Sequence, residues 1–150
     1  MDTTLIPVAG DFAVAHWQPA DPTALGLQAE AVLVHLADSA YRPIITISRH
    51  AADEVGDLAA VADATVADAG ADASVLGREA GDDFVSQLVQ FTAEGHDLRL
   101  TEVALRWSAT HPALTDTVVV ARLTCLPDQL PAAGADFEAL VSTLAPAADA

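Results

Sequence analysis

A long predicted hairpin constrains the fold of this chain more than any other feature. Two strand-length apolar runs, Asp83–Thr92 and Asp97–Trp107, flank the turn Glu94-Gly95-His96. Short turns of this kind join antiparallel strands. A two-residue turn at Gly95-His96 predicts that Glu94 faces Asp97. Because the strands of a hairpin are antiparallel, an antiparallel sheet is expected.

The two faces of this hairpin differ in chemistry, because side chains alternate along a strand. One face is predicted to be core and carries Phe84, Leu88, Val103, Leu105 and Trp107. The other face is mixed and carries Val85, Gln87, Val89, Phe91, Leu100, Glu102, Ala104 and Arg106. If Thr117 pairs near Trp107, Arg122 falls beside Glu102 on the mixed face.

The mixed face has two interpretations. Aromatic and aliphatic side chains among a few charges are typical of a protein- or peptide-binding surface. Alternatively, the C-terminal helix covers this face, and Glu102 and Arg122 form a partly buried pair. The candidate binding residues are Phe91, Glu102, Arg106 and Arg122, together with Trp17. The Trp17 indole has two interpretations: core or edge packing, which is favoured, or a binding residue at the edge of a cleft.

Other segments complete the predicted order β-β-β-α-β-β-β-β-α. The remaining strands are expected at Phe12–Gln18, Gln28–Leu36, Pro43–His50, Ala73–Arg78 and Thr117–Leu126. Helical periodicity over residues 53–70 predicts an amphipathic helix, with Asp53 or Asp57 as its N-cap and Gly70 as its stop. A second helix is expected over Gly134–Leu144. The fold class is therefore α+β, a mainly antiparallel sheet with helices packed on it, in one domain over residues 1–150 with an ordered core at about 10–145.

A family resemblance rests on this layout. The strand Pro43-Ile44-Ile45-Thr46-Ile47, the helix after it, the long hairpin and the last helix resemble the Mog1/PsbP-like α/β sandwich. Within that group the chain is most similar to LpqN-type small actinobacterial lipoproteins and to the DUF1795 group, which includes chaperone-like adaptors for secreted effectors. The resemblance implies a non-enzymatic binding module. The chain departs from the lipoproteins because it has no lipobox cysteine near its start.

The charge balance excludes several classes of partner. Six arginines and no lysine stand against 22 acidic residues, a net charge of −16. Such a surface repels nucleic-acid phosphates and lacks the basic cluster that draws proteins to anionic lipid, so neither nucleic-acid binding nor membrane insertion is expected. It could attract a basic partner, or it could reflect a GC-rich genome or a high-salt habitat. A single cysteine, Cys125, forms no internal disulfide, and a cytoplasmic location is expected unless a leader was removed.

No motif for catalysis, metal or cofactor binding is found. The chain lacks a nucleophile elbow, a phosphate-binding loop and metal-ligand spacings of histidine. The first hypothesis is therefore a binding module or secretion-type adaptor for a protein or peptide. The second is a small-ligand-binding or enzymatic domain with a pocket near Trp17, His50 and Trp107. The third is a structural homodimer formed through a strand edge or apolar face.

Overall fold

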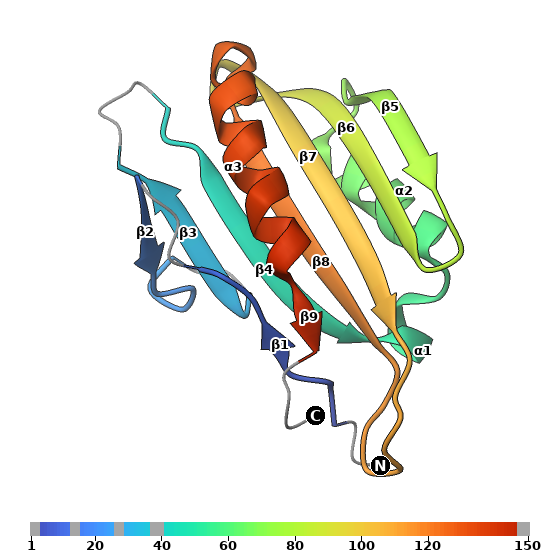
Figure 1. Ribbon diagram of the computed structural model, residues 1–150. Coiled ribbons are helices and arrows are strands. Elements are labelled where there is room, and N and C mark those ends of the chain that lie inside the picture. The colour runs from blue at the N-terminus through green and yellow to red at the C-terminus, as the bar shows by residue number, and fades with distance from the viewer. Residues whose placement is uncertain (1–3, 13–15, 26–28, 37–40, 147–150) are drawn as a thin grey trace.

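The structure is a computed structural model that describes residues 4–12, 16–25, 29–36 and 41–146. A seven-stranded antiparallel sheet in the order β2-β3-β4-β8-β7-β6-β5 forms its centre (Figure 1). The strands are β2 (Trp17–Ala20), β3 (Ala31–His35), β4 (Ile44–Ala51), β5 (Ser74–Ala80), β6 (Phe84–Ala93), β7 (His96–Trp107) and β8 (Thr117–Cys125). A separate two-stranded sheet pairs β1 (Val8–Ala9) with β9 (Ala145–Pro146). The mainly antiparallel α+β fold that the sequence predicted is confirmed.

Helices lie on both faces of the sheet. α1 (Ala52–Val55) and α2 (Leu58–Ala69) lie on one face, and α3 (Leu130–Thr143), which follows the short 3-10 helix η1 (Pro127–Gln129), lies on the other (Figure 1). Asp57 caps α2 by accepting a hydrogen bond from the Ala60 amide at 2.8 Å. Gly56, with φ of 74°, separates α1 from α2, so the one helix predicted over residues 53–70 is two helices.

The hairpin turn lies one residue earlier than predicted. Ala93 pairs with His96, so the turn residues are Glu94 and Gly95. Their φ angles of 53° and 81° are those of a type I′ turn, whose twist matches that of the strands it joins. Every cross-strand partner shifts by two residues, and the residues that share a face stay together because side chains alternate with a period of two.

Two apolar clusters fill the space between the sheet and the helices. The cluster under α3 contains, among other residues, Leu33, Ile45, Ile47, Leu123, Phe137 and Leu140. The cluster under α2 contains Val61, Ala62, Val85, Ala104, Val118 and Val120. Each such side chain of valine size or larger contributes about 1.5–3 kcal/mol on full burial. β8 is buried on both sides over Thr117–Ala121, which explains why its sequence is the most continuous apolar run.

The two long helices cover different parts of the sheet. α2 packs mainly on β6 and β7, whereas α3 packs mainly on β8 (Figure 1). On the α3 face, β6 and β5 therefore extend beyond the helix. This offset creates the site described next.

Candidate functional site: a groove between α3 and the outer strands

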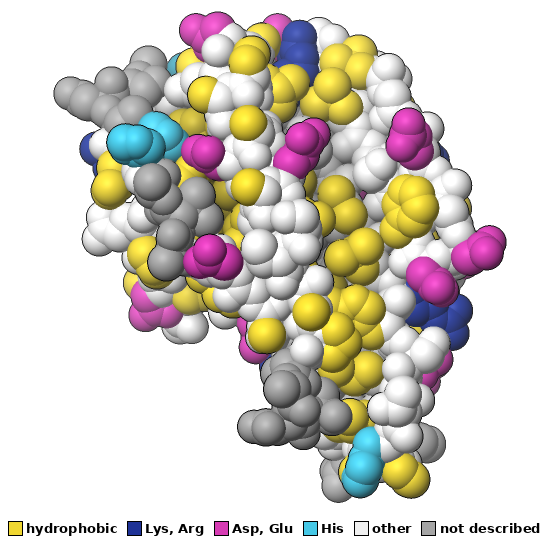
Figure 2. Space-filling view, in the orientation of Figure 1, with side chains coloured by type: hydrophobic (Ala, Val, Ile, Leu, Met, Phe, Trp, Pro, Cys, Tyr) yellow, Lys and Arg dark blue, Asp and Glu magenta, His cyan; other side chains and the backbone are white. Residues whose placement is uncertain are grey.

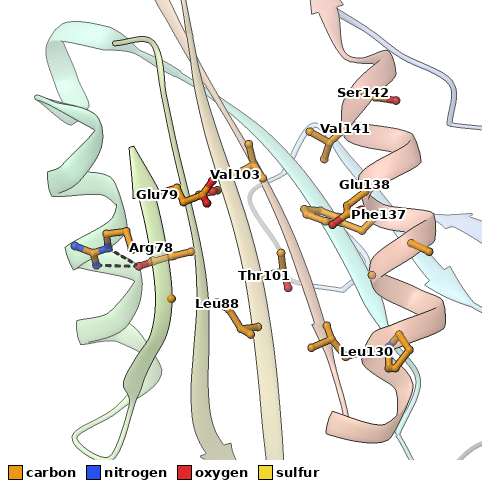
Figure 3. Close-up of a pocket in the computed structure, with 16 residues that line it drawn as sticks. Arg78, Glu79, Leu88, Thr101, Val103, Leu130, Phe137, Glu138, Val141 and Ser142 are labelled. Atoms are coloured by element: carbon orange, nitrogen blue, oxygen red, sulfur yellow. Dashed lines mark hydrogen bonds between the residues drawn. The ribbon is translucent and has the colours of Figure 1, made fainter. Parts of the chain in front are cut away.

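An open apolar groove runs between α3 and the strands that α3 does not cover. Its volume is about 900 Å³, and residues from β5, β6, β7 and α3 line it (Figure 3). Leu88, Thr101 and Val103 form the sheet side, while Leu130, Phe137 and Val141 form the helix side. In the space-filling view, hydrophobic side chains gather beside α3 along this line (Figure 2). A volume of this size is in the range of sites that bind ligands.

The groove contains part of the hairpin face that the sequence predicted to be core. Leu88 and Val103 are half-buried, and Phe84, on the same face, is 39% exposed. The prediction of a core face is therefore correct at Val103 and Trp107, which pack against the α3 cluster, and wrong at Phe84. The reason is that α3 lies over β8 and leaves the outer strands of this face uncovered.

Two carboxylates stand on opposite walls of the groove. Glu79 belongs to β5 and Glu138 to α3, and both residues are exposed. The preceding residue on β5, Arg78, is held on the other face of the sheet, where its guanidinium donates to Asp63 at 2.9 Å and to the side-chain oxygen of Gln87 at 2.8 Å. These bonds connect β5 to α2 and β6, so the strand that carries Glu79 is fixed in place. The groove combines an apolar floor with acidic walls.

The mixed face lies beneath α2 rather than beneath the C-terminal helix, which the sequence analysis had considered as its cover. Glu102 is completely buried there, and it lies opposite Arg122 as expected. Its carboxylate accepts hydrogen bonds from Arg122 Nε at 2.6 Å, Thr65 Oγ1 at 2.5 Å and Gln87 Nε2 at 2.9 Å. This satisfied polar cluster forms part of the contact between α2 and the sheet.

The structure does not gather the five sequence-predicted site residues into one site. It joins Glu102 and Arg122 directly. Phe91 is half-buried opposite Leu98, near the hairpin turn, and Arg106 makes an ion pair with Asp116 at 3.3 Å. None of these five residues is among the described residues that line the groove.

Trp17 connects β2 to α3. The indole is buried in the α3 cluster, and its Nε1 donates to Asp136 Oδ2 at 2.9 Å. The His35 ring meets it edge-on, with 4.9 Å between ring centroids. A buried, hydrogen-bonded indole of this kind packs the helix against the sheet.

The structure does not bring Trp17, His50 and Trp107, which were predicted to line one pocket, to the same face of the sheet. Trp17 and Trp107 pack on the α3 side, whereas His50 pairs with Val118, which belongs to the α2 cluster. The sheet separates the histidine from both tryptophans. On its own side, His50 Nε2 lies 2.9 Å from Ser48 Oγ, and burial together with the positive charge of Arg122 lowers the His50 pKa.

Within the part of the chain that the structure describes, there is no group of three or more His, Cys, Asp or Glu side chains placed to hold a metal ion. None of the helices among these residues is long and apolar enough to cross a membrane. The candidate site remains the groove between α3 and the outer strands, with its apolar floor and acidic walls.

The fold is similar to that of several solved structures. The chain has the Mog1/PsbP-like fold, as the sequence resemblance implied. It is similar to LpqN of Mycobacterium tuberculosis, a protein involved in cell envelope biogenesis, with a TM-score of 0.61 and 14% identity over 94% of this chain and 86% of that one.

Two further structures show the same fold. A protein of unknown function from Pseudomonas aeruginosa gives a TM-score of 0.59 and 20% identity over 88% of this chain and 98% of that one. The PsbP protein of the cyanobacterium Synechocystis sp. PCC 6803 gives a TM-score of 0.58 and 14% identity over 97% of this chain and 95% of that one. No protein-family model and no curated protein matches the chain in sequence. None of the three similar proteins is named as an enzyme.

Proposed function

We propose that this protein is a non-catalytic binding module whose groove takes apolar side chains of a protein partner. The observation that carries the proposal is the uncovered apolar strip between α3 and the outer strands, with Leu88 and Val103 on its floor. In a sandwich, a sheet face is normally covered, so an open apolar strip beside a helix is a surface that a partner can bury.

Charge supports a basic partner. The walls carry Glu79 and Glu138, and the whole chain has a net charge of −16. Acidic residues around an apolar groove favour lysine or arginine beside the bound apolar residues, and they speed association at low salt. They disfavour fatty acids and anionic lipid headgroups. A chaperone-like adaptor for a basic, apolar segment is the role that fits this groove best.

The test compares two leucine variants of the same chemistry. Leu88→Gln places an amide in the groove floor, and Leu36→Gln places one at the end of β3, where Leu36 is exposed. Proteins captured from source-cell lysate by the wild type are identified, and the purified partner is then titrated against both variants. We expect Leu88→Gln to weaken the partner at least tenfold and Leu36→Gln to bind as the wild type, with both variants folded. Equal binding by both variants would show that the groove is not the binding site.

A further inference from the structure

β5 forms one edge of the main sheet and is open along its length. All seven of its residues are exposed, and two of them are large apolar residues, Val75 at 41% and Leu76 at 50%. The opposite edge is different, because β2 has four residues and includes Pro19, which has no amide hydrogen to donate. Open edges present unpaired backbone groups that can pair with another chain.

The pairing pattern shows which β5 amides face outward. The Gly81 amide donates to the Phe84 carbonyl at 2.9 Å, so these two residues close the β5–β6 hairpin. Because antiparallel strands alternate between hydrogen-bonded and non-bonded pairs, Glu79 and Gly77 also bond toward β6. The amides of Arg78 and Ala80, between them, face the open edge. A bulge at Leu76 interrupts the register, so the regular part of the edge is Gly77–Ala80.

Hollows lie on both faces of this edge. On the α3 face, the groove reaches β5 at Gly77, where a side chain in place of the glycine hydrogen would meet nothing within 4 Å. On the α2 face, a second hollow of about 550 Å³ is lined by Asp63, Val66, Ala67, Val75 and Arg78. A strand beside β5 would direct alternate side chains to these two hollows.

We propose that β5 accepts an extended segment of the partner protein as an additional strand of the sheet. The inference rests on the proposed function, because one set of the segment's side chains enters the groove. On that face the segment carries apolar residues beside Gly77 and a lysine or arginine beside Glu79, since cross-strand neighbours of opposite charge stabilise a pair of strands. A second copy of this chain is a poor occupant because each copy carries a net charge of −16.

Ala80 offers a substitution that separates strand addition from other binding. Ala80→Pro removes an amide that faces the open edge and leaves the bonds to β6 intact, and proline is tolerated at such edge positions. Ala80→Thr keeps the amide and suits a strand, so it is the matched control. Thermal unfolding establishes that both variants are folded. If Ala80→Pro is not folded, Glu79→Lys is used instead. It is tested with a version of the peptide described below in which glutamate replaces the lysine.

The probe is a synthetic acetylated peptide of about eight residues, an ordinary strand length. Its sequence alternates threonine with valine, except that lysine replaces one central valine. Backbone amide exchange and chemical shifts are followed by NMR during titration. We expect slower exchange at Arg78 and Ala80, shifts at Leu88, and at least tenfold weaker binding to Ala80→Pro than to Ala80→Thr.

Other outcomes would overturn strand addition in distinguishable ways. Shifts at Leu88 and Val103 without slower exchange at Arg78, and with equal binding to both Ala80 variants, would keep the groove as the site and refute pairing at β5. Slower exchange at Arg78 that depends on protein concentration without peptide would identify a second copy as the occupant. No response at either the groove or the edge would refute the proposal that β5 accepts an extended segment of apolar residues with one basic residue. The groove itself is still tested separately by the comparison of Leu88→Gln with Leu36→Gln.

Discussion

The polar cluster beneath α2 allows a stability prediction to be worked from geometry. Arg122→Met keeps most of the aliphatic length of the side chain and removes the guanidinium. The completely buried carboxylate of Glu102 then loses its 2.6 Å partner and its counter-charge, and Thr65 loses the bond that it accepts from Arg122 at 3.0 Å. Thr65 and Gln87 remain as donors to the carboxylate.

The expected loss lies between two limits. Removing a hydrogen bond to a charged group costs about 1.5–3 kcal/mol. Leaving a buried charge uncompensated costs about 3–5 kcal/mol. The Arg122 side chain is 38% exposed, so water can approach the vacated place and reduce the penalty. We expect the free energy of unfolding to fall by about 2–3 kcal/mol, which lowers the Tm by about 5–10 °C in a domain of this size.

Urea unfolding followed by tryptophan fluorescence measures this loss, and a double variant tests its cause. Glu102→Gln combined with Arg122→Met removes the uncompensated charge while keeping a side chain of the same shape. The double variant should recover at least half of the stability that Arg122→Met loses. A double variant no more stable than Arg122→Met would refute the reasoning, because the loss would then come from packing instead of charge.

Three further predictions concern single residues. Glu94 has a positive φ of 53° in the hairpin turn, and Asn prefers that conformation, so Glu94→Asn should raise the free energy of unfolding by about 0.5–1 kcal/mol; an unchanged or lower Tm would contradict this. Burial raises the Cys125 thiol pKa to about 11 from 9.0, so its contribution to stability is present below pH 9 and is lost as the pH rises toward 11. A disulfide reagent at pH 8 should therefore label Cys125 only as fast as the protein unfolds, and labelling faster than unfolding would show that the thiol is accessible. The pKa of His50 is lowered in the folded protein, so protonation of His50 favours the unfolded chain. The contribution of His50 to stability is therefore present above pH 6.5 and is lost as the pH falls below it. His50→Gln should show a flatter dependence of the urea midpoint on pH between 7 and 5 than the wild type.

The elements of the main sheet were predictable because their signals are local. Proline, glycine and aspartate breaks separate apolar runs, and each predicted run overlaps an observed strand. The overlap is smallest at the first run, Phe12–Gln18, which shares only Trp17 and Gln18 with β2. Residues 13–15 and 26–28, which fall within or beside the first two predicted strands, lie outside the described residues. The short strands β1 and β9 were not predicted, because two residues carry no periodicity.

The faces of the hairpin show where sequence reasoning stops. The grouping of side chains was correct despite the error at the turn, because a shift of two residues preserves the faces. Which helix covers each face depends on contacts between residues far apart in sequence, such as Thr65 with Glu102. The mixed face could be covered because the Glu102 carboxylate is bonded there by Arg122, Gln87 and Thr65. No local pattern shows that one of these donors, Thr65, comes from α2.

The groove could not be found from sequence for a similar reason. Its lining residues come from β5, β6, β7 and α3 and mix apolar side chains with polar and charged ones such as Glu79 and Glu138, and none belongs to a motif. The groove exists because α3 lies over β8 and not over β6, which is a matter of where one helix docks. The weak signal at Ala73–Arg78 was informative in retrospect, since a short strand with few apolar residues is typical of a sheet edge.

The pairing of β1 with β9 has a consequence for engineering. Val8 lies opposite Pro146 and Ala9 opposite Ala145, so segments near the two ends of the sequence run side by side (Figure 1). A linker between the termini could therefore close the backbone into a ring with little rearrangement of the fold. Cyclisation would reduce the entropy of the unfolded chain, by up to about 4–5 kcal/mol for a loop of more than 100 residues. New termini could then be opened at Gly56, an exposed residue between α1 and α2, to give a circular permutant.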